Sequence, residues 1–467
     1  MSDLNETGLM YLWGHLKNHP KCPHGPTLLF GKYVDGELKK FHACSAMRDF
    51  GLCNSFPQPN DKVLKRQLNF QNVYEKKGLT TYDHKKLYLR LNQFMSSQTV
   101  NRIYCHTCNI LISCSEKIKH KNHDLHNFLT NYQMTHPTEF LKPLSNAKKE
   151  AQYFFSEKTT EDIAQILLRL KAKHVLCIGV PRLYEYILHH YENEITCLLL
   201  DFDARFHNFF GPLEYAWYNL FNHHFFNNES KKIFKDFLTQ GGGKDIYLVC
   251  DPPFGGRVEP MSQTIKTIYE NHKKWNNLHS IDDELKILFV FPYFMESVIK
   301  MKSNPPGITG GLSALEMTDY KVEYDNHPIF HGKSIAKKRR SPVRIFTNVK
   351  SSLIILPKSD GYKYCRICQR WVGPENIHCK KCEKCTSKDG SQYKHCDVCE
   401  RCVKSSWDHC DVCKRCTLKT HQCHKQTKIG GKCFQCYENG HVGKDCKKKN
   451  FILPKSMELP MKKKKFN

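Results

Sequence analysis

The chain has 467 residues, enough for two to four domains. Lys plus Arg outnumber Asp plus Glu by 72 to 46, a formal net charge of +26 that favours a polyanionic partner, nucleic acid first. No signal peptide opens the sequence and no apolar run approaches the roughly 18 residues of a membrane span, so neither a secreted nor a membrane protein is expected. The 24 cysteines and 26 histidines therefore indicate zinc sites rather than disulfides.

A first zinc-binding module is expected over residues 15–60, where three cysteines and one histidine make a closed tetrahedral set. Its ligands are Cys22, His24, Cys44 and Cys53. The runs CPHGPTLLF and FHACSAMRD resemble a GRF-type zinc finger, a module that binds single-stranded nucleic acid in other proteins. Gly31-Lys32-Tyr33 only approximates the Gly-Arg-Phe core of that finger, so the sequence supports zinc ligation more strongly than a binding role.

A second zinc-binding module is expected over residues 100–130. Here Cys105 and Cys108 precede three histidines. The choice of His120 and His126 as the other two ligands gives Cys-x2-Cys-x11-His-x5-His, like the fingers of several RNA-binding proteins. The alternative to His126 is His123, at a His-x2-His spacing that is tighter than usual.

From about Leu144, runs with helical spacing alternate with short apolar runs typical of buried strands. This alternation predicts an α/β fold, a Rossmann-like doubly wound core over residues 144–357. Two later strand candidates, Tyr320–Tyr324 and Val343–Val349, could close the sheet as a hairpin-like edge. The other expected elements are the helices Glu161–Leu170, Arg182–Tyr191, Glu229–Leu238 and Ser262–Lys273 and the strands Val175–Val180, Ile195–Asp201, Ile246–Cys250 and Ile287–Phe291.

Two of these strand ends suit S-adenosylmethionine, because ligands bind beyond the carboxyl ends of strands in such a sheet. Gly179 at the end of the first strand permits close approach of a cofactor. Asp201 at the end of the second can hold two ribose hydroxyls. Both features are common in α/β proteins, and a GxGxG motif is absent, so neither feature alone indicates S-adenosylmethionine. The combination becomes specific only with a motif that follows two strands later.

That motif is the tetrad Asp251-Pro252-Pro253-Phe254, directly after the strand Ile246–Cys250. Two consecutive prolines cannot donate to a sheet ladder, so the chain leaves the sheet here. The tetrad resembles the (D/N/S)-PP-(Y/F/W) motif of amino-group methyltransferases; alone, it could also be a tight turn with an Asp cap. Asp251 and the Pro252 carbonyl can each accept one N–H of an adenine amine, which aims its lone pair at an electrophile. Phe254 can stack on a base extruded from its helix or loop.

Eight runs carry a wider resemblance: AQYFF, GVPRL, LLLDFD, FNHHFF, DPPFGG, FPYF, YDNH and SPVRIFTN. They make residues 145–357 similar to the core of the CCHC-type zinc-finger ribosomal RNA N6-adenosine methyltransferases, and the order of the zinc modules also matches. The resemblance implies methylation of large-subunit (28S-type) ribosomal RNA with S-adenosylmethionine. From the residues alone, Asn222 and His223 would belong to a surface loop. The cofactor contacts that the resemblance implies are Gln152, Tyr153, Phe154, Phe155, Arg182, Asp201, Asn222, His223 and Asp251.

A Cys/His array follows over residues 362–425, with the spacing Cys-x2-Cys-x9-His-x6-Cys repeated. Each His-Cys pair would divide its two residues between successive zinc ions, which cross-links a segment with little core. The array resembles the cysteine-rich region of DHHC acyltransferases, but its tetrads read NIHC, YKHC and WDHC without flanking membrane spans, so acyltransferase activity is not expected. The four sets are Cys365, Cys368, His378 and Cys385; Cys379, Cys382, His395 and Cys402; Cys396, Cys399, His409 and Cys416; and Cys410, Cys413, His421 and Cys423.

A zinc knuckle is expected over residues 431–448, with the ligands Cys433, Cys436, His441 and Cys446. Phe434 and nearby lysines suit base stacking and phosphate contact. The basic tail, residues 449–467, is either a nucleolar or RNA address or a solvated end. Altogether the sequence predicts about seven zinc ions, each with four protein ligands and no open position for catalysis.

Together these features predict a zinc-rich RNA N6-adenosine methyltransferase in the nucleus and nucleolus, with the cytoplasm as a second location. The rival from another class is a non-catalytic RNA-binding ribosome assembly factor with a retained methyltransferase fold. The intact DPPF tetrad speaks against that rival. A different RNA, or DNA, stays open as the substrate.

Overall fold

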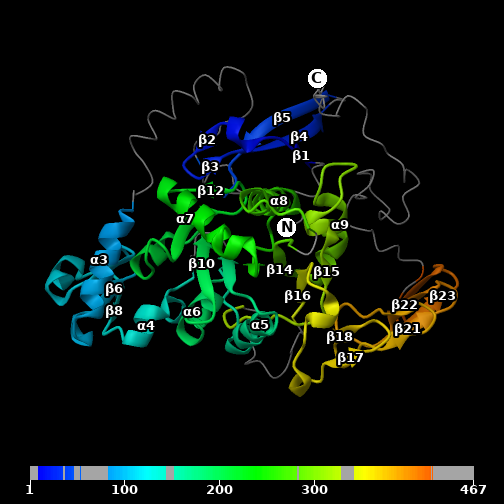
Figure 1. Ribbon diagram of the computed structural model, residues 1–467. Coiled ribbons are helices and arrows are strands. Elements are labelled where there is room, and N and C mark those ends of the chain that lie inside the picture. The colour runs from blue at the N-terminus through cyan, green and yellow to red at the C-terminus, as the bar shows by residue number, and fades with distance from the viewer. Residues whose placement is uncertain are drawn as a thin grey trace.

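The computed structural model describes residues 9–34, 37–46, 53, 82–143, 152–280, 283–327, 341–421 and 423. Figure 1 shows an α/β core with three attachments: an N-terminal β module in blue, a second small module in cyan, and a series of hairpins in yellow to orange. Within these residues, no helix combines the length and the apolar character that crossing a bilayer requires.

The core is an eight-stranded mixed sheet in the order β12-β11-β10-β9-β13-β14-β16-β15. The strands β11, β10, β9, β13 and β14 are mutually parallel, whereas β16 runs antiparallel to β14. The chain winds outward from β9 in both directions, so the predicted doubly wound α/β fold is confirmed. The strand bounds are β9 (His174–Ile178), β10 (Thr196–Asp201), β11 (Tyr215–Asn219), β12 (His224–Phe225), β13 (Ile246–Cys250), β14 (Lys286–Pro292), β15 (Glu316–Met317) and β16 (Val343–Thr347).

Helices cover both faces of this sheet, because alternate residues of each buried strand point to opposite sides. On β9, Val175 and Cys177 pack in the layer of α5 and α6, and Leu176 and Ile178 pack in the layer of α7 and α8. The helix bounds are α5 (Glu157–Arg169), α6 (Pro181–His190), α7 (Asn228–Leu238), α8 (Val258–Trp275) and α9 (Glu296–Lys302).

One predicted strand is wrong, and three strands of the core sheet were not predicted. Residues Tyr320–Tyr324 do not form a strand, because their backbone bonds to two different segments: the Val322 amide bonds to Val343, and Tyr324 bridges to Phe155. The strand that pairs with β16 is instead β15, a few residues earlier. Like β15, the strands β11 and β12 were not predicted from the sequence.

The N-terminal module is built on a three-stranded sheet of β1 (Met10–Tyr11), β4 (Leu28–Val34) and β5 (Glu37–Ala43). Tyr11, Leu28 and Phe30 form its small buried core. The pair β2 (Lys21–Cys22) and β3 (Gly25–Pro26) carries the first zinc ligands. In Figure 1 the module lies over α8 and β12 of the core.

The second module is a sheet of β6 (Ile103–Cys105), β7 (Ile110–Ile112) and β8 (Leu125–Asn127), preceded by α3 (His84–Met95) and followed by α4 (Asn131–Thr135). Its exit segment is tied to α6 by Glu185, whose carboxylate accepts hydrogen bonds from both the amide and the hydroxyl of Thr138. Burial raises the pKa of Glu185 to about 8, while the bonds from Thr138 act in the opposite direction.

The C-terminal hairpins pack against the core through ion pairs. Arg370 pairs with Asp319, and Lys388 pairs with Glu296 at the start of α9. The Asn376 side chain also donates to Asp319, at 2.7 Å. The hairpin strands are β17 (Lys363–Cys365), β18 (Arg370–Val372), β19 (His378–Cys379), β20 (Lys384–Cys385), β21 (Tyr393–Cys396), β22 (Arg401–Lys404), β23 (Trp407–Cys410) and β24 (Arg415–Leu418).

Candidate active site and zinc centres

Three predicted site residues meet at the carboxyl ends of adjacent strands. Gly179 follows β9, Asp201 ends β10 and Asp251 follows β13. The Asp251 amide donates to the Ile178 carbonyl at 3.1 Å, and the Gly179 amide donates to the Leu200 carbonyl at 3.0 Å. The three residues therefore lie side by side at the centre of a doubly wound sheet, where such folds bind ligands.

Position 179 requires glycine for two reasons, its backbone conformation and the closeness of a neighbouring carbonyl. Its φ of +67° lies in the left-handed region, and a Cβ at this position would come within 2.9 Å of the Asp251 carbonyl oxygen. The backbone at the end of β9 can thus approach the segment Asp251–Gly256, which we name the catalytic loop because it carries the predicted catalytic residues.

Asp251 is held by one hydrogen bond from Tyr324, whose Oη lies 3.0 Å from Oδ1. Burial raises the pKa of Asp251 well above its usual range, and the Tyr324 hydroxyl acts in the opposite direction. Pro252 is buried, Pro253 is exposed and Phe254 is half-buried. The Phe254 ring meets Phe291 and Tyr324 edge to face, which fixes its plane beside the carboxylate.

Because the Tyr324 hydroxyl lowers the pKa of Asp251, its removal should raise that pKa further. In its predicted role Asp251 accepts a hydrogen bond from the reacting amine and must be ionised, so the reaction rate is expected to fall as the pH falls through this pKa. We expect Tyr324→Phe to move the acid limb of the kcat–pH profile to higher pH. Tyr320→Phe is the matched control, since its hydroxyl bonds to Asp162 instead. Superimposable profiles for wild type and Tyr324→Phe would contradict the role assigned to this hydrogen bond.

The segment Gln152–Phe155 is tied to Asp203, just beyond the end of β10, and to Asn326; its contacts with the cofactor stay a prediction. The Gln152 side chain donates to Asp203 at 3.1 Å, and its backbone carbonyl accepts from Asn326 at 2.8 Å. Asn326 also accepts from the Phe154 amide at 2.9 Å. Sequence reasoning did not assign Tyr324 and Asn326, although both belong to the run YDNH that carries part of the resemblance.

Arg182 joins this closing segment to the core. Its guanidinium donates to the Phe155 carbonyl at 3.0 Å and pairs with Glu139 and Asp325. The guanidinium carbon also lies 5.7 Å from the centre of the Phe154 ring. These contacts make Arg182 a residue that orders Gln152–Phe155; its direct contact with a cofactor stays a prediction.

Asp201 is the carboxylate predicted from the sequence to hold ribose hydroxyls. Its Oδ1 accepts from the Asp203 amide at 2.8 Å. Burial, then repulsion from the Asp203 charge, raises the pKa of Asp201 to about 7. The Asp203 carboxylate is itself paired with Arg205 at 2.6 Å, so Asp201 keeps acceptor capacity for a ligand.

The other two predicted cofactor residues have different partners. The Asn222 side chain donates to the His24 and Pro26 carbonyls of the N-terminal module, at 3.0 and 2.8 Å. The His223 ring bonds to the Tyr218 hydroxyl at 2.7 Å and packs beside Phe234. The structure thus uses Asn222 for docking and His223 for packing, and their cofactor contacts stay predictions.

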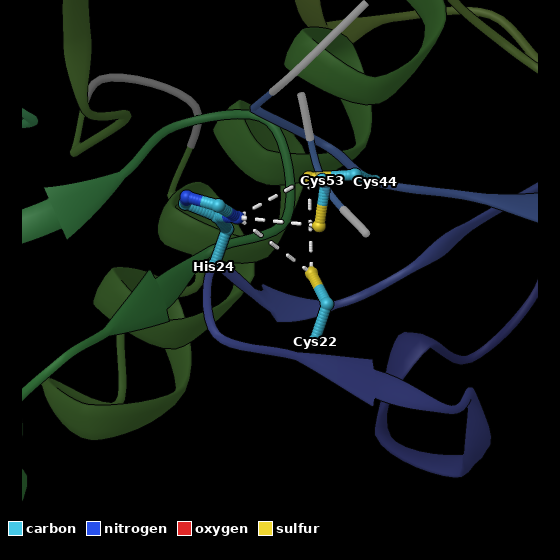
Figure 2. Close-up of side chains that lie close together, drawn as sticks. All are labelled: Cys22, His24, Cys44 and Cys53. Atoms are coloured by element: carbon cyan, nitrogen blue, oxygen red, sulfur yellow. Dashed lines mark hydrogen bonds between the residues drawn. The ribbon is translucent and has the colours of Figure 1, made fainter. Parts of the chain in front are cut away.

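Figure 2 shows the side chains of the first zinc set pointing toward one another. Cys22, His24, Cys44 and Cys53 come together as predicted, with all four ligand atoms within 4.8 Å of one another. The Sγ atoms of Cys22 and Cys44 are 3.7 Å apart. Two sulfurs bound to one tetrahedral zinc at about 2.3 Å are about 3.8 Å apart, so the set fits zinc.

In the second module the prediction of His126 as a ligand is wrong. The set is Cys105, Cys108, His120 and His123. The His123 ring lies 3.2 Å from the Cys108 sulfur, because the turn after His120 brings it back toward the cysteines. His126 lies instead on β8, opposite Tyr104, and its ring packs on Phe140.

The C-terminal array brings its ligands together as predicted, with His-Cys neighbours divided between successive sets. In three of its sets the ligand atoms lie within 4.8 Å of one another. Sulfur separations of 3.8 Å for Cys368–Cys385 and 3.7 Å for Cys382–Cys402 and Cys399–Cys416 again match one zinc. In the fourth set, His421 Nε2 lies 3.4 Å from the Cys413 sulfur and 3.0 Å from that of Cys423. The zinc knuckle ligands Cys433, Cys436, His441 and Cys446 lie outside the described residues.

The chain is similar to known proteins over the residues that form this site. A family model described as probable N6-adenine methyltransferase matches residues 146–338, which include Gly179, Asp201 and Asp251. The rRNA N(6)-adenosine-methyltransferase ZCCHC4 of Mus musculus is 38% identical over 367 residues, which is 77% of this chain and 70% of the relative. The Homo sapiens protein of that name is 37% identical over 77% of this chain and 70% of its own length. For Xenopus tropicalis the values are 38%, 77% and 73%.

These matches span more than two thirds of both chains and include the strand ends and the DPPF tetrad. The sequence resemblance rests on eight runs, which include the DPPF tetrad, and on the order of the zinc modules. The chain belongs to the family of rRNA N6-adenosine methyltransferases.

Proposed function

We propose that this protein uses S-adenosylmethionine to methylate N6 of an adenosine in ribosomal RNA, specifically RNA of the large subunit. The observation that carries the proposal is the placement of Asp251, within the DPPF tetrad, beside Gly179 and Asp201 at the strand ends. The names of the curated relatives support the ribosomal substrate.

In this proposal the residues of the chain orient the amine. The Asp251 carboxylate and the Pro252 carbonyl each accept one N–H of the adenine, and Phe254 stacks on the extruded base. Gly179, Asp201 and the segment Gln152–Phe155 would hold the cofactor, which supplies the methyl group. The zinc sites are structural, since four protein ligands leave no open position; we propose about seven zinc ions in the chain.

RNA binding is assigned to the zinc modules and to the basic surface. The net charge of +26 favours phosphate contacts. Several weakly binding modules on one chain raise affinity through effective concentration. The proposed location is the nucleus and nucleolus, with the cytoplasm as a second location. The bounds of the zinc modules, of the core and of the basic tail are likewise proposed.

The test of the substrate is to map N6-methyladenosine across ribosomal RNA from cells with and without this protein. Loss of the mark at one large-subunit adenosine, restored by wild type, supports the proposal. An unchanged ribosomal map, with marks lost from another RNA or from DNA, would transfer the activity to that substrate. No loss in any nucleic acid would favour the non-catalytic assembly factor.

The zinc knuckle is expected to deliver RNA rather than to support the core. We expect Cys433→Ser to weaken RNA binding and methylation while binding of S-adenosylhomocysteine, measured by calorimetry, stays as in wild type. Cys114→Ser is the matched control, because Cys114 is exposed and belongs to none of the assigned ligand sets. If RNA and cofactor affinities fall together, the knuckle supports the core, and the delivery role is wrong.

A further inference from the structure

The N-terminal module, which is the first zinc finger, contacts the core at three places, two of them at the end of the catalytic loop Asp251–Gly256. The first is a pair of buried asparagines, Asn219 at the end of β11 and Asn222 in the turn after it. The Asn219 side-chain nitrogen lies 3.0 Å from the His24 carbonyl and 2.8 Å from Ser45 Oγ. That of Asn222 lies 3.0 Å from the same carbonyl and 2.9 Å from Ser45 Oγ. Both asparagines therefore bind the backbone carbonyl of the zinc ligand His24 and the side chain of Ser45, which follows the zinc ligand Cys44.

This contact leads directly to the catalytic loop. The Asn219 side-chain oxygen accepts from the Phe221 amide at 3.1 Å, which fixes the turn that carries the Phe221 ring. A Cβ on Gly256 would lie only 2.6 Å from Cε1 of that ring. Phe221 thus packs on the last residue of the catalytic loop, and Gly256 is required for this approach.

The second contact is made just beyond the loop. Arg257 donates to the Leu9 carbonyl of the finger at 3.3 Å, and its guanidinium lies 5.4 Å from the centre of the Phe30 ring. One turn into α8, Gln263 accepts from the Tyr11 hydroxyl at 2.5 Å and donates to the Gly14 carbonyl at 2.7 Å. The finger therefore fixes the start of the helix into which the catalytic loop continues.

A third contact reaches the cofactor side of the site. The His24 ring packs against Phe202, with centroids 6.2 Å apart, and Phe202 directly follows Asp201. At the edge of the sheet, the His224 ring leaves no space for a side chain at Gly25 of the finger, since a Cβ there would lie 2.4 Å from it. The finger is therefore fitted closely against the strand ends.

We infer that the N-terminal finger is a positioning element of the active site, and that Ser45, Asn219 and Asn222 form the contact through which it holds the catalytic loop. The inference rests on the proposed methyltransferase function. It assigns to the finger an effect on turnover that is separate from any RNA contact. Small misplacements of reacting groups cost rate steeply, so the loss of a docking contact should lower kcat rather than weaken RNA binding.

The test compares Ser45→Ala and Asn222→Ala with Lys39→Ala in the full-length protein. Ser45 is not a zinc ligand, so its variant should retain zinc, which metal analysis checks. We expect Ser45→Ala and Asn222→Ala each to lower kcat by roughly tenfold, with KM for RNA within twofold of wild type. Lys39 is exposed on β5 and does not take part in the docking contact. If the finger contacts RNA through this residue, Lys39→Ala should raise KM for RNA and leave kcat as in wild type. In the double variant the two kcat effects should not multiply, because both remove the same contact.

Calorimetry with S-adenosylhomocysteine gives a readout that does not depend on activity. The inference predicts a several-fold weaker cofactor affinity for Ser45→Ala, because Phe202, which packs against the His24 ring, and Gly256, which packs against Phe221, lose their support. An unchanged kcat with a raised KM in both docking variants would overturn it. If the wild-type protein shows no turnover, the proposed function is wrong. Calorimetry then tests the positioning role by itself, and an unchanged cofactor affinity in Ser45→Ala overturns that role.

Discussion

Asp251→Ala is expected to lower the rate of methyl transfer by about 10²–10³-fold, because one positioned acceptor for the reacting amine is lost. The side chain is half-buried, and its assigned partner in the structure is the Tyr324 hydroxyl, so the variant should still fold. The measurement is single-turnover transfer of labelled methyl groups to ribosomal RNA.

Asp236→Ala is the matched control for this variant. Asp236 is an exposed aspartate on α7, away from the strand ends that form the site. Its variant should retain the wild-type rate, and both variants should unfold near the wild-type temperature. A rate for Asp251→Ala above about a tenth of wild type would end the catalytic role of this carboxylate, since the expected loss is far larger.

Removal of zinc is expected to unfold the array between Lys363 and Cys423 while the core sheet persists. The described part of this segment buries few apolar side chains, mainly Val372 and Val403. Binding of a structural zinc at neutral pH is worth about 10–16 kcal/mol in small zinc modules, and that free energy is folding free energy there. The sheet strands β9 and β13 have an extensive apolar core that does not depend on metal.

The measurement is hydrogen exchange before and after treatment with a chelator, with native mass spectrometry for the zinc count. We expect protection across β17–β24 to be lost and protection of β9 and β13 to remain, which is the internal control. A total near three zinc ions in the untreated protein would contradict the interleaved ligand sets. If the array stays protected from hydrogen exchange after complete removal of zinc, its fold does not depend on the metal and the prediction is wrong.

The central strands were predictable because they are buried on both faces. The run Ile246–Cys250 is continuously apolar, and the structure gives β13 the same bounds. In contrast, β11 has the mixed sequence YAWYN and becomes a strand through parallel pairing with β10. Such non-local hydrogen bonding leaves no periodic signal in the strand itself. The same holds for β15, whose two residues gain their place from β16.

The site was predictable only in part, for a similar reason. Gly179, Asp201 and Asp251 follow from strand ends, whereas the spacing of three histidines could not decide between His123 and His126. That choice depends on where β8 places the His126 ring. Tyr324 lies 73 positions from Asp251, so no local pattern could join them. The docking role of Asn219 and Asn222 likewise requires the finger to be in place.

The most direct test of the central claim uses purified protein, a large-subunit ribosomal RNA and S-adenosylmethionine with a deuterated methyl group. After digestion to nucleosides, mass spectrometry identifies which nucleoside carries the label. The account predicts label in N6-methyladenosine with wild type and a loss of about 10²–10³-fold with Asp251→Ala. Label in a different nucleoside, or an equal amount of N6-methyladenosine from both proteins, would contradict it.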